Sequence, residues 1–286
     1  MKVTEAINKF KNYTEVTKSK GTQEYYVYYL KVIEDNIGNL ECDNVNSDVI
    51  LQYVKERKGD NPEVSNATLN KHIAAIKTVI KYATDREIKF NKLKERKKII
   101  PTVSVNTHKK IFSYYEKHLD DKFSFRNYLF FRILLDTGLR LSEITNLRII
   151  DMELEENLIH VRTTKTDVDR YVAITRSTKV LLNKFLILQD VNNYIFTNFK
   201  DDEPMSTSSV ESFVYRIKKK LKIKENITPH KWRHTFATNF LRSGGNIETL
   251  RILMGHSNLK TTQKYLHLSK QDILTEYKRI MENYVE

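Results

Sequence analysis

Apolar residues recur every three or four positions along most of the chain, the period of an amphipathic helix. Over the first 90 residues this pattern predicts four helices, at residues 3–20, 22–37, 48–58 and 67–88. The apolar stripe of the fourth consists of Leu69, Ile73, Ile76 and Ile80. Ser47 or Asp48 is expected to cap the third helix, because short oxygen-bearing side chains satisfy free N–H groups at a helix start.

The pattern after residue 102 predicts a second helical region with one exception. Helices are expected at residues 107–119, 124–136, 142–147, 177–189, 207–222, 229–243 and 247–254. Between Asn157 and Thr175, the segments LIHVRTT and RYVAIT alternate apolar and polar residues, which is typical of strands. The predicted fold class is therefore mainly α, with a small antiparallel β-sheet in the C-terminal domain and a turn at residues 165–169.

A basic segment, KFNKLKERKKIIP, separates the two regions. Its residues 89–98 hold six basic residues and one acid, and Pro101 closes the run. We predict a helical domain over residues 1–90, a linker over 91–103 and a second domain over 104–286. The linker either is solvated or lies against a phosphate backbone.

Composition narrows the class of partner. The formal net charge of +13 favours a polyanion, either nucleic acid or an acidic membrane surface. The single cysteine, Cys42, excludes an internal disulfide and any cysteine-based zinc cluster. No run approaches the roughly 20 apolar residues of a membrane span, and the N-terminus lacks a signal-peptide core. A soluble, cytoplasmic protein is expected.

Four short clusters carry candidate chemistry. Arg140 follows Gly138 in LLDTGLRLSEI, and Lys165 lies at the tip of the predicted hairpin. In HKWRH, His230 and Arg233 are three residues apart and share one helix face. The apolar residues of that helix, Trp232, Phe236 and Phe240, lie on another face. The fourth cluster, LMGHSNLKTTQKYLHLS, holds His256 and Tyr265. Each cluster alone has an ordinary structural explanation.

Together these residue types suit phosphoryl transfer. Arginine forks match phosphate oxygens, and their charge offsets the charge that develops in the transition state. A lysine or histidine can protonate a departing alkoxide, and a tyrosine hydroxyl can attack phosphorus to give a covalent phosphoester. That bond conserves the energy of the broken phosphodiester, so the step is reversible without a nucleotide.

These motifs resemble those of the tyrosine recombinase (phage integrase) family, and the resemblance covers essentially the whole chain. DTGLRLSEI is similar to the context of the family's first arginine, with Glu143 as its accompanying acid. The family's hairpin lysine precedes a strand-opening arginine by five residues, as Lys165 precedes Arg170. The implied catalytic set is Arg140, Lys165, His230, Arg233, His256 and Tyr265.

The resemblance implies a site-specific recombinase with a core-binding (SAM-like) domain and an integrase-type catalytic domain that clamp DNA between them. Tyr265 would attack to form a 3′-phosphotyrosine intermediate, and Lys165 would protonate the departing 5′ oxygen. The arginines and histidines would hold the phosphate. No cofactor or metal is expected. Homodimers on each double-stranded recombination site would pair into a homotetramer, with a related second recombinase as an alternative, and exchange strands through a Holliday junction.

Surface contacts to DNA are expected from seven basic residues: Lys71, Lys77, Lys81, Lys97, Lys98, Arg216 and Lys219. The strip from Arg216 to Arg242 carries nine Lys or Arg and one acid. The terminal segment QDILTEYKRIMENYV is expected to form a helix that docks on a neighbouring subunit or on its own chain. Because the core-binding helices begin almost at Met1, we expect no arm-binding domain and a simple, Xer-like member. Its role stays open among integration and excision of a mobile element, resolution of chromosome dimers and resolution of transposition intermediates.

Three alternatives remain at this point. The hairpin TTKTDVDR has two aspartates where many relatives have glycine and basic residues, so Lys179 or Lys184 could replace Lys165, although both lie in a predicted helix. A type IB topoisomerase uses the same chemistry as a monomer. A helical DNA-binding regulator without catalysis would explain the charge and the helices, but not six reactive residues in the family's order.

Overall fold

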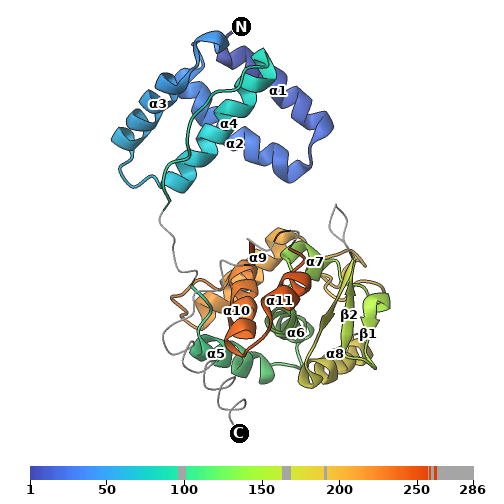
Figure 1. Cartoon of the computed structure of the whole chain (residues 1–286). Coiled ribbons are helices and arrows are strands. Elements are labelled where there is room, and N and C mark those ends of the chain that lie inside the picture. The colour runs from blue at the N-terminus through green and yellow to red at the C-terminus, as the bar shows by residue number, and fades with distance from the viewer. Residues whose placement is uncertain (96–100, 163–168, 190–191, 257, 259–260, 263–286) are drawn as a thin grey trace, which may run out of the picture. The chain divides into compact units, whose positions relative to one another are not determined.

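The computed structural model describes residues 1–95, 101–162, 169–189, 192–256, 258 and 261–262. The chain divides into two compact units, Met1–Lys98 and Ile99–Glu286. Each has its own hydrophobic core, and they are described separately (Figure 1). Among helices of the described ranges, none combines the length and the apolar character that crossing a membrane requires.

The first unit is a small helical bundle. Its elements are α1 (Val3–Thr17), α2 (Lys20–Ile37), the 3₁₀ turn η1 (Cys42–Asn44), α3 (Ser47–Asp60) and α4 (Asn66–Thr84). Helices α1, α2 and α4 pack against one another. The predicted stripe of α4 is confirmed, because all four of its apolar residues are buried. The four helices predicted from the sequence are therefore present.

The cap predicted for α3 was wrong by one residue. Asn46, and neither Ser47 nor Asp48, is the N-cap, and its side-chain oxygen accepts hydrogen bonds from the backbone N–H groups of Asp48 and Val49. Three consecutive residues of cap type stand at this point, so composition alone could not choose among them. In α4 the N-cap is Ser65, whose hydroxyl accepts from the N–H of Thr68.

The second unit surrounds helix α6 with other helices. Its helical elements are α5 (Val105–Glu116), α6 (Lys122–Thr137), α7 (Leu141–Thr145), η2 (Ile149–Asp151), α8 (Arg176–Leu188), α9 (Thr207–Lys220), α10 (Pro229–Arg242) and α11 (Ile247–Leu253). Helix α6 contacts α5, α8 and α10 (Figure 1). Three of its aromatic residues, Phe125, Phe130 and Phe131, are fully buried. This aromatic core fixes the helices from which the candidate site is built.

The predicted antiparallel sheet is present, with one more strand than expected. Strand β2 (Leu158–Val161) pairs with β3 (Arg170–Ala173), and Val161 lies opposite Arg170. A two-residue strand, β1 (Met152–Glu153), adds to the other edge of β2. The mainly helical fold class with a small antiparallel sheet is confirmed. The predicted turn with Lys165 lies outside the described residues, apart from Asp169.

Helix α10 is fixed by its aromatic residues, as its pattern predicts. The Trp232 side chain is fully buried, 5.0 Å from the ring of Phe131, and its Nε1 donates to the carbonyl of Ile227 at 3.1 Å. Phe236 packs in a smaller cluster with α11, and Phe240 lies partly buried beside it. Two separate apolar contacts therefore set the rotation of α10, and with it the direction of its polar face.

Candidate active site

Four of the six predicted catalytic residues line one cavity of about 640 Å³ in the second unit. Its wall consists of Leu139, Arg140, Leu141, Glu211, Thr228, Pro229, His230, Arg233, His256 and Thr261. The four catalytic candidates, Arg140, His230, Arg233 and His256, come from three separate segments of the sequence. The other two, Lys165 and Tyr265, lie outside the described residues.

The turn between α6 and α7 brings Arg140 to Arg233. Gly138 ends α6 with a φ of +62°, a conformation that glycine adopts without strain, and a Cβ there would overlap the ring of Phe236. Its carbonyl accepts a hydrogen bond from Nη1 of Arg233 at 2.6 Å. Arg140 then serves as the N-cap residue of α7. The glycine of the TGLR motif thus allows the close approach of α10 to this turn.

Arginines from three elements converge on the C-terminal end of α11. The Leu253 carbonyl accepts from Arg170 at 2.8 Å, the Met254 carbonyl from Arg233 at 2.6 Å, and the Gly255 carbonyl from Arg140 at 2.6 Å. The last carbonyls of a helix lack partners within the helix and carry partial negative charge, so cations stabilise them. This arrangement fixes the segment that leads directly into His256.

Glu143 balances the positive charge of these arginines. Its carboxylate accepts from Arg140 at 2.9 Å and from Arg170 at 3.0 and 2.9 Å, and Arg233 lies 4.0 Å away. Burial alone would raise the pKa of the Glu143 carboxyl, but the hydrogen bonds and charges of Arg170 and Arg140 outweigh burial and hold this pKa below its ordinary value. The accompanying acid of the arginine motif therefore stays ionised while nearly buried.

The contacts of His256 define its tautomer in this arrangement. Its Nε2 lies 3.1 Å from Nη2 of Arg233, and its Nδ1 lies 2.9 Å from the hydroxyl of Thr262. A guanidinium group can only donate, so Nε2 accepts and the proton of the neutral ring is on Nδ1. The backbone of His256 is held as well, because its carbonyl accepts from Arg251 at 2.8 Å.

His230 occupies the mouth of the cavity rather than its floor. It lies in the first turn of α10 and is exposed, whereas Arg233 on the same helix is 5% exposed. The ring of buried His234 lies 4.3 Å from that of His230 in an edge-on arrangement. The predicted shared face of His230 and Arg233 is thus present, with the arginine deep and the histidine accessible.

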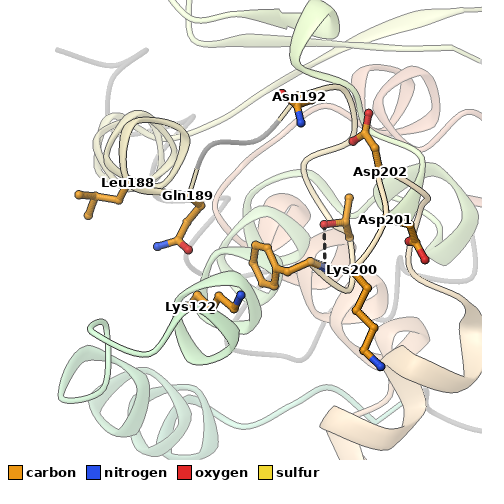
Figure 2. Close-up of a pocket in the computed structure, with 9 residues that line it drawn as sticks. Lys122, Leu188, Gln189, Asn192, Lys200, Asp201 and Asp202 are labelled. Carbon is orange, nitrogen blue, oxygen red and sulfur yellow. Dashed lines mark hydrogen bonds between the residues drawn. The ribbon is translucent and has the colours of Figure 1, made fainter.

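A second hollow of the same unit, of about 440 Å³, contains none of the predicted residues (Figure 2). It lies between α6, α8 and the segment 192–202. Lys122 and Lys200 contribute positive charge to its wall, and Asp201 and Asp202 contribute negative charge. Because these charges balance, the hollow has no preference for a polyanion. Among the described residues, no three or more His, Cys, Asp or Glu side chains are grouped to hold a metal ion.

Comparison with protein families decides the class. Residues 101–272 match the model of the phage integrase family, and residues 7–87 match that of the phage integrase N-terminal SAM-like domain. This chain belongs to the phage integrase family. The resemblance drawn from the motifs is confirmed, and with it the class of enzyme, since tyrosine recombinases of this family break and rejoin DNA.

Several curated relatives of this chain are named recombinases. The tyrosine recombinase XerA of Pyrococcus horikoshii is 31% identical over 93% of this chain and 90% of its own length. XerA of Saccharolobus solfataricus is 40% identical over 54% of this chain, and a probable integrase/recombinase of Acholeplasma phage L2 is 34% identical over 52%. The last two matches span about half of those relatives' own length, 50% and 52%.

Solved structures share the fold of this chain. The Tn1549 transposon integrase in complex with transposon right-end DNA aligns with a TM-score of 0.79 at 20% identity, over 98% of this chain and 100% of that one. A XerA recombinase crystal structure aligns with a TM-score of 0.55 at 28% identity, over 96% and 98% of the two chains. Both alignments include nearly the whole chain.

The integrase motifs did not point to every residue of the cavity wall. Glu211, Thr228 and Thr261 line the cavity, and Thr262 contacts His256, but none of them stood out in the sequence. Thr228 precedes the HKWRH motif by two residues, and Thr261 and Thr262 follow the LMGHS motif closely. Proximity to a motif is therefore the sequence feature that could have identified these three residues. Glu211 on α9 carried none, because only tertiary packing brings it to the wall.

The residues predicted to contact DNA lie in both units of the chain. On α4, Lys71 is exposed, Lys77 is half-buried, and Lys81 is exposed and forms an ion pair with Glu87. On α9, Arg216 and Lys219 are exposed. The two predicted linker contacts, Lys97 and Lys98, lie outside the described residues. These five placements are compatible with a surface role, which stays a prediction.

Proposed function

We propose that this chain is a site-specific recombinase that cleaves and rejoins double-stranded DNA through a covalent 3′-phosphotyrosine intermediate and a Holliday junction. The observation that carries the proposal is the meeting of Arg140, His230, Arg233 and His256 in one cavity. Two arginine forks can donate to a single phosphate, and the two imidazoles lie beside them in the same cavity. Membership of the phage integrase family makes a DNA phosphodiester the substrate that fits this site.

In the proposed reaction, the hydroxyl oxygen of Tyr265 attacks phosphorus and loses its proton. The P–O5′ bond breaks, Lys165 gives a proton to the departing 5′ oxygen, and DNA stays attached through a 3′-phosphotyrosine. Arg140 and Arg233 offset the charge on the non-bridging oxygens, His230 is a further donor, and His256 helps to hold the phosphate site through its contact with Arg233. A 5′ hydroxyl of the exchanging strand reverses the step, so strand joining needs no nucleotide.

The arrangement on DNA follows from the two units and their charge. We assign DNA binding to a core-binding domain over residues 1–90 and to a catalytic domain over 104–286, joined by the basic linker 91–103. Exposed cations on α4 and α9 would neutralise backbone phosphates. Two subunits would occupy one recombination site, and two such sites would pair into a tetramer in which strands exchange, with the terminal helix docked on a neighbouring subunit or on its own chain.

The decisive test is covalent capture of DNA on Tyr265. A duplex that carries the recombination site and a nick beside the scissile phosphate traps the intermediate. Cleavage releases a short fragment with a free 5′ hydroxyl, and once this fragment has diffused away the strand cannot be rejoined. Wild-type protein should give an adduct that survives denaturing electrophoresis. Y265F should bind the same duplex with unchanged affinity and give no adduct, since phenylalanine lacks the attacking oxygen.

Tyr215 provides the matched control. It is exposed on α9 in the same unit, and Y215F removes the same hydroxyl from a different place. Y215F should form adduct at the wild-type rate. An adduct from Y265F would assign the nucleophile to another residue, and a wild-type protein that binds the site without forming any adduct would support a DNA-binding regulator instead.

A further inference from the structure

Arg170 is a buried arginine on a strand, behind the wall of the candidate active site. It opens β3, and the residue is 6% exposed. The next residue, Tyr171, faces outward, so Arg170 occupies an inward position where strands normally place apolar side chains. A charge is rarely this deeply buried unless its partners are close and well aligned. The partners of Arg170 therefore indicate its role.

Its guanidinium group joins two parts of the site. Nη1 and Nη2 donate to the two carboxylate oxygens of Glu143 at 3.0 and 2.9 Å, a bidentate fork. Nε donates to the carbonyl of Leu253 at 2.8 Å. The backbone of Gly255 rests against the same group, because a Cβ there would lie 2.8 Å from Nη1. Arg170 thus contacts both the arginine motif and the segment that carries His256, without lining the cavity.

Glu143 links Arg170 to Arg140 through hydrogen bonds to both residues. Its carboxylate accepts from Nη1 of Arg140 at 2.9 Å and from the backbone N–H of Arg140 at 2.7 Å. We infer that Arg170 is a positioning residue, which holds Arg140 through Glu143 and the His256 segment through the Leu253 carbonyl. This inference rests on the proposed DNA cleavage, because positioning is measured through it. A strand residue beside the hairpin with Lys165 would then set the geometry of phosphate binding.

The charges around Glu143 make this role testable by pH. The groups that face its carboxylate are Arg140 at the start of α7, Arg170 on β3 and Arg233 on α10, with His256 behind Arg233. Burial acts to raise the pKa of Glu143, and Arg170 is the leading group that opposes burial. Without Arg170 this pKa should rise, so the carboxyl becomes protonated as the pH falls from neutral, and a neutral Glu143 holds Arg140 less firmly.

The experiment compares R170M, R170K and the double variant R170M/E143Q. For each full-length variant, three quantities are measured: the dissociation constant for the duplex site, the single-turnover rate of adduct formation between about pH 5 and about pH 9, and the thermal midpoint. Methionine keeps the bulk of the side chain but removes charge and donors. Lysine keeps the charge. Its ammonium group cannot donate two parallel hydrogen bonds to the Glu143 carboxylate and a third to the Leu253 carbonyl.

R170M should bind the duplex within about threefold of wild type and form adduct about 100-fold more slowly, because small displacements of catalytic groups have effects of that size. The pH below which its rate falls should lie above that of wild type. R170K should also form adduct slowly, but the pH below which its rate falls should equal that of wild type. The double variant should lose the added acid sensitivity, since glutamine does not titrate.

Arg162 on the same hairpin is the matched control. Its Nε donates to the buried carboxylate of Asp151 at 2.6 Å, and among the described residues it is paired with neither Glu143 nor Leu253, the partners of Arg170. R162M should therefore keep the wild-type cleavage rate even where it lowers the thermal midpoint. An equal loss of rate in R162M, or a wild-type rate and pH profile in R170M, overturns the inference.

Two further outcomes have defined meanings. If R170M does not fold, R170K decides: slow cleavage at native stability supports the inference, and a wild-type rate overturns it. If wild-type protein forms no adduct at all, the proposed function fails. That result is distinguishable from failure of the inference, because it does not involve a substitution at Arg170.

Discussion

At the scale of single residues, the candidate site depends on backbone positions as much as on charged side chains. Gly138 and Gly255 both have positive φ, and each offers its carbonyl to an arginine from a distant segment. Neither position has room for a Cβ. The TGLR and LMGHS motifs therefore contain glycine for a physical reason: a Cβ at Gly138 would overlap the ring of Phe236, and a Cβ at Gly255 would crowd the guanidinium groups of Arg170 and Arg140.

Gly255 gives a test at this scale. In G255A the new Cβ would lie 2.8 Å from the guanidinium of Arg170 and 3.3 Å from that of Arg140, on a residue with φ of +59°. Strain of this kind costs about 1–3 kcal/mol, so G255A should lower the free energy of unfolding by that amount and slow adduct formation by moving His256. Urea denaturation and the nicked duplex measure the two effects.

Gly21 is the control for that substitution. It lies in α2, and a Cβ there meets nothing within 4 Å. Because alanine is favoured over glycine within helices, G21A should stabilise the first unit by about 0.5–1 kcal/mol and leave cleavage unchanged. If G255A cleaves DNA at the wild-type rate, the close packing of Gly255 is not required for the site.

At the scale of elements, a very short helix places His256. Helix α11 has seven residues, too few to be stable alone, and it is fixed at both ends. Asn246 caps its start, with its side-chain oxygen accepting from the N–H groups of Glu248 and Thr249, and the three arginines cap its end. The position of His256 thus depends on caps rather than on helix propensity.

Removing the N-terminal cap tests this dependence. N246A should lower the free energy of unfolding by about 1 kcal/mol, the usual value of such a cap, and should also slow adduct formation. Asn46 forms the same pair of hydrogen bonds at the start of α3, so N46A is a control of equal chemistry in the first unit. N46A should lose stability by a similar amount and cleave at the wild-type rate. Equal cleavage by both variants would show that α11 needs no cap to place His256.

At the scale of the whole molecule, two units and a net charge of +13 favour a large polyanion as the substrate. Part of this excess positive charge lies on α9, whose last turn carries Lys218, Lys219 and Lys220. Binding to DNA through such groups releases counterions, so affinity falls as salt rises.

Substitutions on α9 test whether its exposed surface contributes to the salt dependence of DNA affinity. In R216Q/K219Q, two exposed cations of α9 are lost, so the slope of log affinity against log salt should become less steep by about 2 if each meets one phosphate. The adduct rate at saturating protein and low salt should not change. The control K179Q/K184Q removes the same charge from α8 and should keep the wild-type slope, as titration of a labelled duplex would show. An unchanged slope in R216Q/K219Q would exclude α9 from the DNA interface.

Sequence periodicity predicted most of the architecture because helices here have clear apolar faces. The stripe of α4 and the aromatic face of α10 are local signals, and both are confirmed by burial. Strand β1 was missed, since a two-residue strand has no period to detect. The cap of α3 was misplaced by one residue, because Asn46, Ser47 and Asp48 all have suitable side chains.

The sequence by itself determined the helical class, the family motifs and the identity of four residues that share the cavity, because each of these is written in local spacing or residue type. Only the tertiary structure decided which partners those residues have. The convergence of Arg140, Arg170 and Arg233 on Glu143 and on three successive carbonyls joins segments up to 115 residues apart. The chain's spacing does not encode such contacts, since they arise from how α6, α10 and the sheet pack around a common core.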